Sequence, residues 1–288
     1  MKKILITGSE GQLGKEIKFV YERYPHYHFL FLSKKEFDIT NEEKLISFFN
    51  KEKIDILINC AAYTKVDMSE QKSSIAKAVN SSAVATLSRL AVSYNFCLIH
   101  ISTDYVFDGE KKTPYTENDP CNPLGVYGRT KFQGEREILN IKPRGIIIRT
   151  SWLYSTYGEN FFNKILELSK TNNEIKVVND QFGTPTYAAF LAETILKIIG
   201  SDSFVEITSK PEIFHISNEG SCSWFDFASR IVKKTESTTK ILPCTTSEYP
   251  TDTKRPPYSV LDNKRAHQVF GLKPLSWLDS LDNCINRD

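Results

Sequence analysis

Two side chains near the middle of the chain have types and spacing suited to proton transfer. Tyr127 and Lys131 lie four residues apart at the start of a helical pattern over residues 124–139, so one helix face presents both. A free tyrosine titrates near pH 10, roughly three units above neutrality. A neighbouring ammonium group stabilises the phenolate, so we expect Lys131 to lower the pKa of Tyr127 and make it an effective acid or base.

A third polar side chain, Thr103, is predicted to lie beside this pair. It follows the apolar run 96–102, which is typical of a buried strand. In an open parallel sheet, ligands bind beyond the carboxyl ends of the strands. We therefore expect the Thr103 hydroxyl to orient a substrate carbonyl. The spacing of Tyr127 and Lys131 alone is weak evidence, since any amphipathic helix can carry it, but together with Thr103 and the turn described next it becomes specific.

A glycine-rich turn near the N-terminus is typical of a dinucleotide site. The strand-like residues 3–7 lead into this turn, and a helical pattern follows it. The first glycine permits the tight bend, the second lets backbone N–H groups approach a pyrophosphate, and the third allows close packing of helix on sheet. The pattern predicts binding of NADPH or NADH. The expected cofactor contacts in the turn are Gly8, Glu10, Gly11, Gln12, Leu13 and Gly14.

The end of the second predicted strand bears on which dinucleotide is used. NAD-selective sites carry an acidic residue there, roughly 20 residues beyond the glycines. Here the strand ends in Lys34 and Lys35 without an acid at its tip, so a ribose 2′-phosphate is compatible with it. An ordinary solvated loop accounts for the two lysines equally well. We expect Asp38 and Ile39, a little further on, to pass beside the adenine.

Strand-like and helical patterns alternate through residues 1–150, and the strands are continuous apolar runs. Such runs are typical of a parallel sheet covered by helices on both faces. The sequence therefore predicts an α/β fold with a doubly wound parallel sheet, Rossmann-like, and a dinucleotide-binding domain over residues 1–150. Residues 151–288 are expected to form mainly a smaller substrate-binding lobe, with some elements returning to the main sheet. The expected strands are residues 3–7, 27–32, 54–60, 96–102, 145–150 and 213–217, and the expected helices are 11–24, 41–51, a stretch ending near 94, 124–139, 161–170, 188–199, 224–234 and 264–270.

Composition excludes several classes of protein. The net charge of +2 over 288 residues predicts no broad basic face, so nucleic acid is not an expected partner. The apolar run after the N-terminal lysines is too short for a signal peptide, and no stretch reaches the roughly 18 apolar residues that span a membrane. The six cysteines form no CxxC pair and are expected to be reduced, structural thiols. We expect a cytoplasmic protein without a membrane partner.

The combination of these motifs resembles the extended short-chain dehydrogenase/reductase family and, within it, the dTDP-4-dehydrorhamnose reductases. The likeness covers nearly the whole chain. Beyond the glycine turn and the Tyr127–Lys131 pair, it rests on the segments 59–67, 102–109, 122–124, 149–154, 180–186, 255–256 and 259–262.

The resemblance implies hydride transfer to the C4 keto group of dTDP-4-dehydro-L-rhamnose, which gives dTDP-L-rhamnose for nucleotide-sugar and cell-surface polysaccharide biosynthesis. Tyr127 would donate the proton, Lys131 would tune it, and Thr103 would help to hold the sugar. The implied substrate contacts are Thr103, Asp104, Tyr127 and Trp152, and Ala61, Ala62 and Tyr63 would join Tyr127 and Lys131 along the cofactor. For Trp152 and for residues 61–63, ordinary core packing stays open, and for the turn 181–186 ligand contact is an even alternative to a simple turn.

The chain departs from the family pattern at two places. Many relatives carry Asn where Tyr258 stands, which weakens inference about the nucleotide end of the pocket. Some members form a metal-linked dimer through glutamates. Glu16 matches one such position, but Ala189 occupies another, so we expect no metal and interpret Glu16 as a solvated helix residue. The chain is expected to be a monomer or a homodimer.

Three other functions stay open on this fold. A nucleotide-sugar 4,6-dehydratase needs an acid and a base beside the threonine, and Tyr105 stands where the second carboxylate is expected. A 4-epimerase would retain its cofactor tightly and return the hydride. A non-catalytic, NADP-binding regulatory subunit of methionine adenosyltransferase would keep the fold, but the intact set of Thr103, Tyr127 and Lys131 disfavours it.

Overall fold

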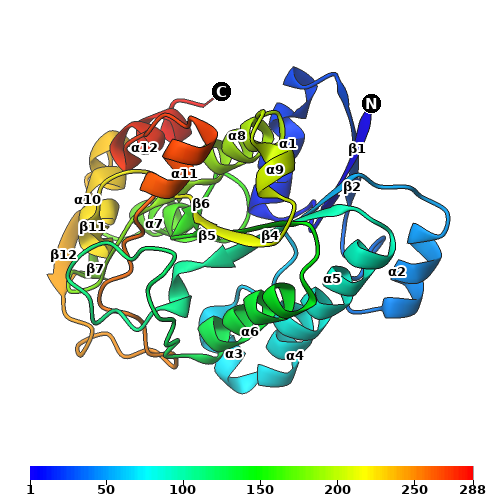
Figure 1. Ribbon diagram of the computed structural model, residues 1–288. Coiled ribbons are helices and arrows are strands. Elements are labelled where there is room, and N and C mark those ends of the chain that lie inside the picture. Colours follow the sequence, from blue (N-terminus) through cyan, green and yellow to red (C-terminus); the bar gives the residue numbers. More distant parts are fainter. Residues whose placement is uncertain (288) are drawn as a thin grey trace.

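Six parallel strands form the central sheet of the computed structural model, which describes residues 1–287 (Figure 1). Their order across the sheet is β10-β5-β4-β3-β1-β2. The order reverses between β1 and β3, which is where a dinucleotide binds in such sheets. The predicted doubly wound parallel sheet is therefore confirmed. The strands are β1 (Lys2–Thr7), β2 (Tyr27–Leu32), β3 (Ile56–Asn59), β4 (Cys97–Thr103), β5 (Gly145–Thr150) and β10 (Glu212–His215).

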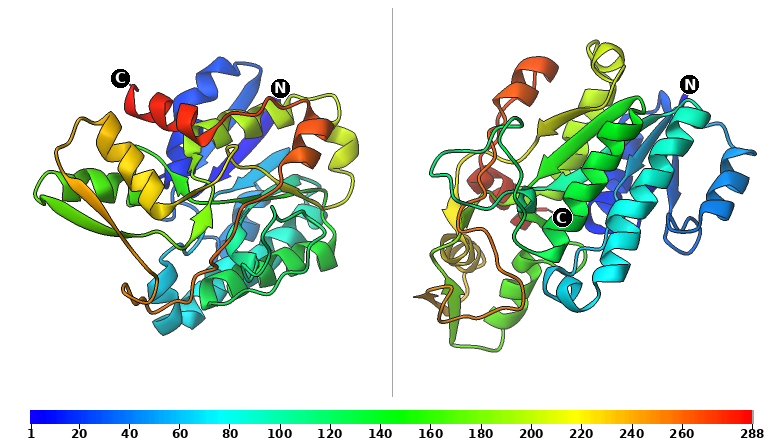
Figure 2. Two further views of the ribbon diagram at one scale, coloured as in Figure 1. Left: turned by 90° about the vertical axis from the view of Figure 1, so that its left-hand side faces the viewer. Right: turned by 60° about the horizontal axis from the view of Figure 1, so that its bottom comes forward.

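Helices cover both faces of this sheet, as Figures 1 and 2 show. Every residue of β3 and β5 is buried, which explains why their sequences are continuous apolar runs rather than alternating ones. One face packs against α1 (Gln12–Val20), α8 (Ala188–Ile199), α9 (Phe204–Ile207) and α11 (Lys264–Phe270). The other face packs against α2 (Glu42–Phe49), α5 (Ala83–Ser93) and α6 (Val126–Ile141).

A smaller lobe packs beside the sheet around a core of its own. In it, β7 (Glu174–Val178) pairs in parallel with β12 (Lys240–Cys244). Its helices are α7 (Phe161–Ser169), α10 (Trp224–Lys234) and α12 (Trp277–Ile285). A capping box begins α10, since Ser223 and Asp226 each accept a hydrogen bond from the other's backbone N–H. The sequence patterns did not predict β7, β12 or α12.

Short elements connect these parts. The predicted helical stretch ending near Tyr94 is interrupted, because a π-helical turn precedes α5. Within residues 1–287, every helix is too short or too polar to span a lipid bilayer. The short helical elements are η1 (Tyr21–Arg23), α3 (Val66–Gln71), α4 (Ser73–Lys77), η2 (Ala78–Ser82) and η3 (Asp104–Val106), and the short strands are β6 (Leu153–Tyr154), β8 (Phe182–Gly183), β9 (Thr186–Tyr187) and β11 (Cys222–Ser223).

Candidate active site

The turn between β1 and α1 leaves room for a pyrophosphate. Gly8 has φ +63°, and a Cβ there would lie 2.8 Å from the backbone nitrogen of Ala61. A Cβ on Gly14 would lie 2.6 Å from Cα of Ser9, so glycine lets α1 approach the turn. No side chain among residues 1–287 caps the start of α1, which leaves its first N–H groups for an anion. The turn therefore fits a dinucleotide.

The segment after β3 lies against this turn and is held by Asn80, a residue that the sequence patterns did not predict. Asn80 in η2 accepts a hydrogen bond from the Tyr63 N–H at 2.9 Å and donates one to the Tyr63 carbonyl at 3.1 Å. A π-helical turn inside a helix often marks a functional site. An asparagine within a helical pattern gives no such signal in a single sequence.

The other predicted cofactor residues lie in different environments. Ile39 is buried in the core beneath α2 and α5, and Leu13 is buried in the core of the opposite face. Asp38 accepts hydrogen bonds from the backbone and the hydroxyl of Thr40 at 3.0 and 2.7 Å. Glu10 is exposed, as are the lysines at the end of β2. Contact of these residues with a cofactor stays a prediction.

Thr103, Asp104 and Tyr127 come together at the carboxyl end of β4. Thr103 donates a hydrogen bond to the Asp104 carboxylate at 3.1 Å and accepts one from the Tyr105 N–H at 3.2 Å. The Tyr105 and Tyr127 rings meet edge to face with centroids 5.6 Å apart. The helix α6 reaches this turn through Gly128, where a Cβ would lie 2.2 Å from the Tyr105 carbonyl oxygen.

Burial controls the ionisation of both acids in this cluster. It raises the pKa of Tyr127 to about 12, although a hydrogen bond with Thr103 opposes the shift. The predicted lowering of the Tyr127 pKa is therefore wrong in this structure, and Tyr127 is protonated at neutral pH. Burial also raises the pKa of Asp104 to about 7, against a hydrogen bond that Ser259 donates at 2.6 Å. The cluster thus holds a proton on a phenol beside a carboxyl that titrates near neutrality.

Lys131 is buried one helical turn after Tyr127 and directs its ammonium group at β4. Its Nζ lies 2.5 Å from the Ile101 carbonyl oxygen and 3.4 Å from Nε2 of His100. Burial lowers the Lys131 pKa to about 8, while Glu135 and Cys60 act in the opposite direction. The buried carboxylate of Glu135 is itself bound by Arg149 through two hydrogen bonds of 2.9 and 2.7 Å.

The structure overturns the interpretation of Glu16 as a solvated residue. Glu16 is fully buried, and it accepts hydrogen bonds from the Ser155 hydroxyl at 2.6 Å and from the Arg287 guanidinium. The prediction was wrong because the partner cation lies 271 residues away in sequence. Within residues 1–287, no three or more His, Cys, Asp or Glu side chains are arranged to hold a metal ion.

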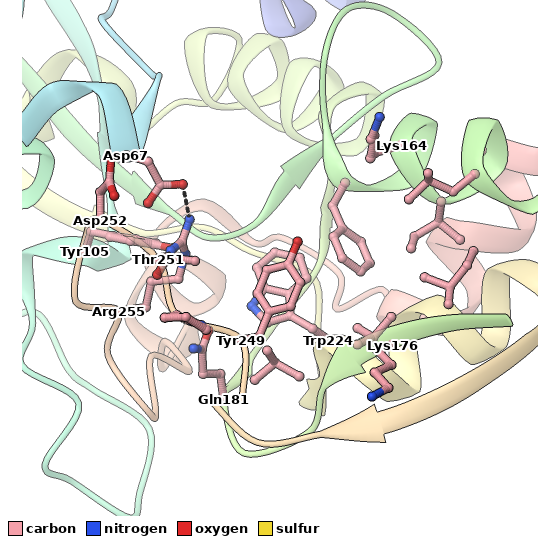
Figure 3. Close-up of a pocket in the computed structure, with 17 residues that line it drawn as sticks. Asp67, Tyr105, Lys164, Lys176, Gln181, Trp224, Tyr249, Thr251, Asp252 and Arg255 are labelled. Carbon is pink, nitrogen blue, oxygen red and sulfur yellow. Dashed lines mark hydrogen bonds and ion pairs between the residues drawn. The ribbon is translucent and has the colours of Figure 1, made fainter. Parts of the chain in front are cut away.

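A cavity of about 720 Å³ opens between the smaller lobe and the segment after β3 (Figure 3). One of its lining residues is Tyr105, whose ring packs against Tyr127. Both apolar and charged side chains line it, which suits a ligand with both a ring and an anionic group. The residues lining it include Asp67, Tyr105, Phe161, Lys164, Lys176, Gln181, Trp224, Tyr249 and Arg255.

The predicted substrate residue Trp152 lies behind the wall of this cavity. It adopts φ +44°, and its indole stacks on that of Trp224 with centroids 3.5 Å apart and planes 5° apart. The cavity lining includes Trp224. At the other end, Arg255 pairs with Asp67 at 2.8 Å (Figure 3). Of the turn 181–186, Gln181 lines the cavity.

A glycine turn at the crossover point, a threonine ending β4 and a tyrosine–lysine pair on α6 define an oxidoreductase of the extended short-chain dehydrogenase/reductase class. The RmlD substrate binding domain model matches residues 1–288. A dTDP-4-dehydrorhamnose reductase of Aggregatibacter actinomycetemcomitans is 40% identical over 98% of each chain. The spore coat polysaccharide biosynthesis protein SpsK of Bacillus subtilis is 38% identical over 98% of this chain and 96% of its own.

A solved structure agrees with these matches. The dTDP-4-dehydrorhamnose reductase of Bacillus anthracis in complex with NADP has a TM-score of 0.93 and 36% identity, with 100% of each chain covered. The chain therefore belongs to the RmlD family, and the predicted resemblance is confirmed.

Proposed function

We propose that this chain reduces the C4 keto group of dTDP-4-dehydro-L-rhamnose to dTDP-L-rhamnose with NADPH, as a step of nucleotide-sugar and polysaccharide biosynthesis. The observation that carries the proposal is the cluster of Thr103 and Tyr127, with Lys131 on the same helix, beside Tyr105, which lines the 720 Å³ cavity. The names of the relatives in Aggregatibacter and Bacillus support the substrate class and the pathway. The NADP complex of the Bacillus anthracis protein supports the cofactor, and NADH stays an alternative.

Each of the site residues has a separate role in the proposed reduction. When bound, the reduced nicotinamide supplies a hydride to the substrate carbonyl carbon. Thr103 orients the carbonyl, and Tyr127, which is protonated at neutral pH because burial raises its pKa to about 12, gives its proton to the carbonyl oxygen. Lys131 stabilises the phenolate that remains. Gly8, Gly11 and Gly14 admit the pyrophosphate.

The cavity provides a place for the rest of a nucleotide sugar. Trp224 and Tyr249 offer aromatic faces to a base or sugar ring, and Arg255 offers a guanidinium to a diphosphate. The division into a cofactor-binding part, residues 1–150, and a mainly substrate-binding part, residues 151–288, belongs to the same proposal.

We also infer that the protein works in the cytoplasm as a monomer or a homodimer. All six cysteines are free, and four of them are buried, as suits a reducing compartment.

Tyr127→Phe tests the proposal. The variant keeps the ring and its packing but loses the proton, so turnover should fall by about 10²–10⁴-fold while the unfolding temperature stays close to that of the wild type. The measurement is NADPH absorbance with a dTDP-4-keto-6-deoxyhexose as substrate. Tyr94→Phe is the matched control, because among residues 1–287 the Tyr94 hydroxyl bonds only the exposed Asn50 side chain, at 2.7 Å.

Three outcomes contradict the proposal. When a dTDP-6-deoxyhexose with a C4 hydroxyl is supplied instead, inversion at C4 without net NADPH consumption identifies a 4-epimerase. Cofactor binding without either reaction identifies a regulatory subunit, and an unchanged rate in Tyr127→Phe removes the assigned proton donor.

A further inference from the structure

Three strands place a row of buried polar side chains across the sheet, ending at Lys131. Thr7 of β1 is in register with Asn59 of β3, and Asn59 is in register with His100 of β4. The Thr7 hydroxyl donates a hydrogen bond to Oδ1 of Asn59 at 2.7 Å, and Nδ2 of Asn59 lies 3.1 Å from Nδ1 of His100. All three side chains are at most 1% exposed. The other nitrogen of the ring, Nε2, faces Nζ of Lys131 at 3.4 Å.

The hydrogen-bond donors along this row determine which ring nitrogen of His100 carries the proton. The amide nitrogen of Asn59 can only donate, so Nδ1 of His100 accepts. The imidazole is neutral, because burial and the Lys131 charge hold the pKa of His100 well below its usual range. A neutral imidazole with an accepting Nδ1 carries its hydrogen on Nε2. That N–H therefore points at Lys131.

A donor in this position disfavours the charged form of Lys131. An ammonium group has three N–H bonds and no lone pair, so it cannot accept from Nε2–H, whereas a neutral amine can. The Ile101 carbonyl takes one hydrogen of Lys131 in either form.

Of the other groups facing Lys131, Glu135 carries a negative charge that raises the Lys131 pKa, and this charge is paired with Arg149. On α6, Glu135 is bound by Arg149 and by the Ser102 hydroxyl, and the Tyr127 phenol keeps its proton because its pKa is raised to about 12. After β3, burial raises the pKa of the Cys60 thiol to about 12, so it is uncharged at neutral pH. Among these neighbours, His100 is the one whose hydrogen-bond donor favours the amine over the ammonium.

We propose that His100 is a positioning residue, held by Asn59 in the Nε2–H tautomer, that makes the Lys131 ammonium release its proton more readily. The proposal rests on the reductase function proposed above. After Tyr127 has given its proton to the substrate, the Lys131 ammonium returns one to the phenolate. An O–H bond forms on Tyr127, an N–H bond breaks on Lys131, and the amine that results accepts the Nε2–H of His100. A proton from water restores the ammonium between turnovers.

The tautomer is directly measurable in the full-length protein labelled with ¹⁵N-histidine. Long-range ¹H–¹⁵N spectra distinguish a protonated from an unprotonated ring nitrogen, and the His100→Gln variant assigns the signal among the five histidines of the chain. We expect a protonated Nε2 and an unprotonated Nδ1 at pH 7. A protonated Nδ1 overturns the proposal. This readout does not depend on catalysis, so it also separates a failure of the inference from a failure of the proposed function.

A second experiment reverses donor and acceptor in the hydrogen bond between residue 59 and His100. Asn59→Asp places an acceptor at Nδ1, so the hydrogen moves to Nδ1 and the Nε2 lone pair faces the ammonium. The Lys131 pKa, followed by ¹³Cε NMR, should rise, and the alkaline limb of the turnover profile should move with it.

The added charge of the aspartate also raises the Lys131 pKa, so the same substitution is made in the His100→Gln protein. The rise in the histidine protein should exceed that in the glutamine protein by about one unit, a tenfold change in the proton equilibrium. Equal rises overturn the proposal. His215→Gln is the matched control, because His215 is equally buried and lies 3.5 Å from the Arg149 guanidinium. It should leave the Lys131 pKa unchanged.

Discussion

At the scale of single residues, Asp104 shows how burial makes a carboxyl group sensitive to pH. The side chain lies between Thr103 and Ser259 with 1% of its surface exposed, and burial raises its pKa to about 7. A raised pKa means that the folded state favours the protonated acid. The stability that results is fully present below the unfolded-state pKa near 3.9 and is lost as the pH rises through about 7.

Asp104→Asn should remove this dependence, because an amide does not ionise. Urea unfolding at pH 4.5, 6 and 8 measures the free energy of unfolding of both proteins. The variant should gain stability relative to the wild type as the pH rises, by at most about 4 kcal/mol for a shift of about three units. A difference that does not change with pH would show that Asp104 is ionised in the folded protein throughout.

The sequence predicted some site residues and missed others for a physical reason. Thr103 and Tyr127 stand in short motifs whose local geometry brings their functional groups to the strand end. Asn59 and His100 meet only because of the register between β3 and β4, and Asn80 meets Tyr63 only through tertiary packing. A single sequence does not show which residues of two strands pair. Nor does it show how deeply Tyr127 is buried, and burial reversed the expected direction of the Tyr127 pKa shift.

At the scale of elements, the contact of α6 with the end of β4 determines where Tyr127 lies. A Cβ on Gly128 would lie 2.2 Å from the Tyr105 carbonyl oxygen, and backbone atoms cannot yield as a flexible side chain can. Gly128→Ala should therefore push α6 away from Thr103. We expect a loss of stability of about 1–3 kcal/mol and a larger proportional loss of kcat than of substrate affinity.

Gly200→Ala is the control for this substitution. Gly200 ends α8 with φ −86°, and a Cβ there would make only ordinary contacts at 3.6 Å. Thermal unfolding and steady-state kinetics of the two variants are compared. Equal effects would mean that the close approach of α6 does not position Tyr127.

Helices and strands with a clear local pattern were predicted from the sequence, whereas those that depend on tertiary contacts were not. The six strands of the main sheet are recognisable because most of them lie between helices and contain a continuous run of apolar residues. The predicted helices at residues 188–199, 224–234 and 264–270 have the bounds found for α8, α10 and α11. By contrast, β7 and β12 form a two-stranded sheet with exposed positions and a proline in β12. They gain their partners only across more than 60 residues of chain, so neither shows a strong strand pattern.

At the scale of the whole molecule, the C-terminal segment ties the first helix to the smaller lobe. Arg287, just after α12, reaches Glu16 on α1 and donates a hydrogen bond to the Tyr187 hydroxyl of β9 at 2.8 Å. Its guanidinium also lies 3.8 Å from the centroid of the Phe19 ring. Glu16 is fully buried, whereas the Arg287 side chain is 13% exposed. The two partners of this pair therefore differ in their access to water.

This difference predicts an asymmetric response to substitution. Arg287→Met leaves a buried carboxylate without a counter-charge, which should cost about 3 kcal/mol of unfolding free energy. Glu16→Gln should cost less, because Arg287 reaches water, and adding Glu16→Gln to Arg287→Met should recover part of the loss. Urea unfolding of the two single variants and the double variant measures this. The exposed pair Arg23–Glu193 is the control, where Arg23→Met should change stability by no more than about 0.5 kcal/mol. If the double variant is less stable than Arg287→Met, the loss of stability comes from the packing of Arg287 against Phe19. The unpaired buried charge of Glu16 is then not what destabilises the Arg287→Met protein.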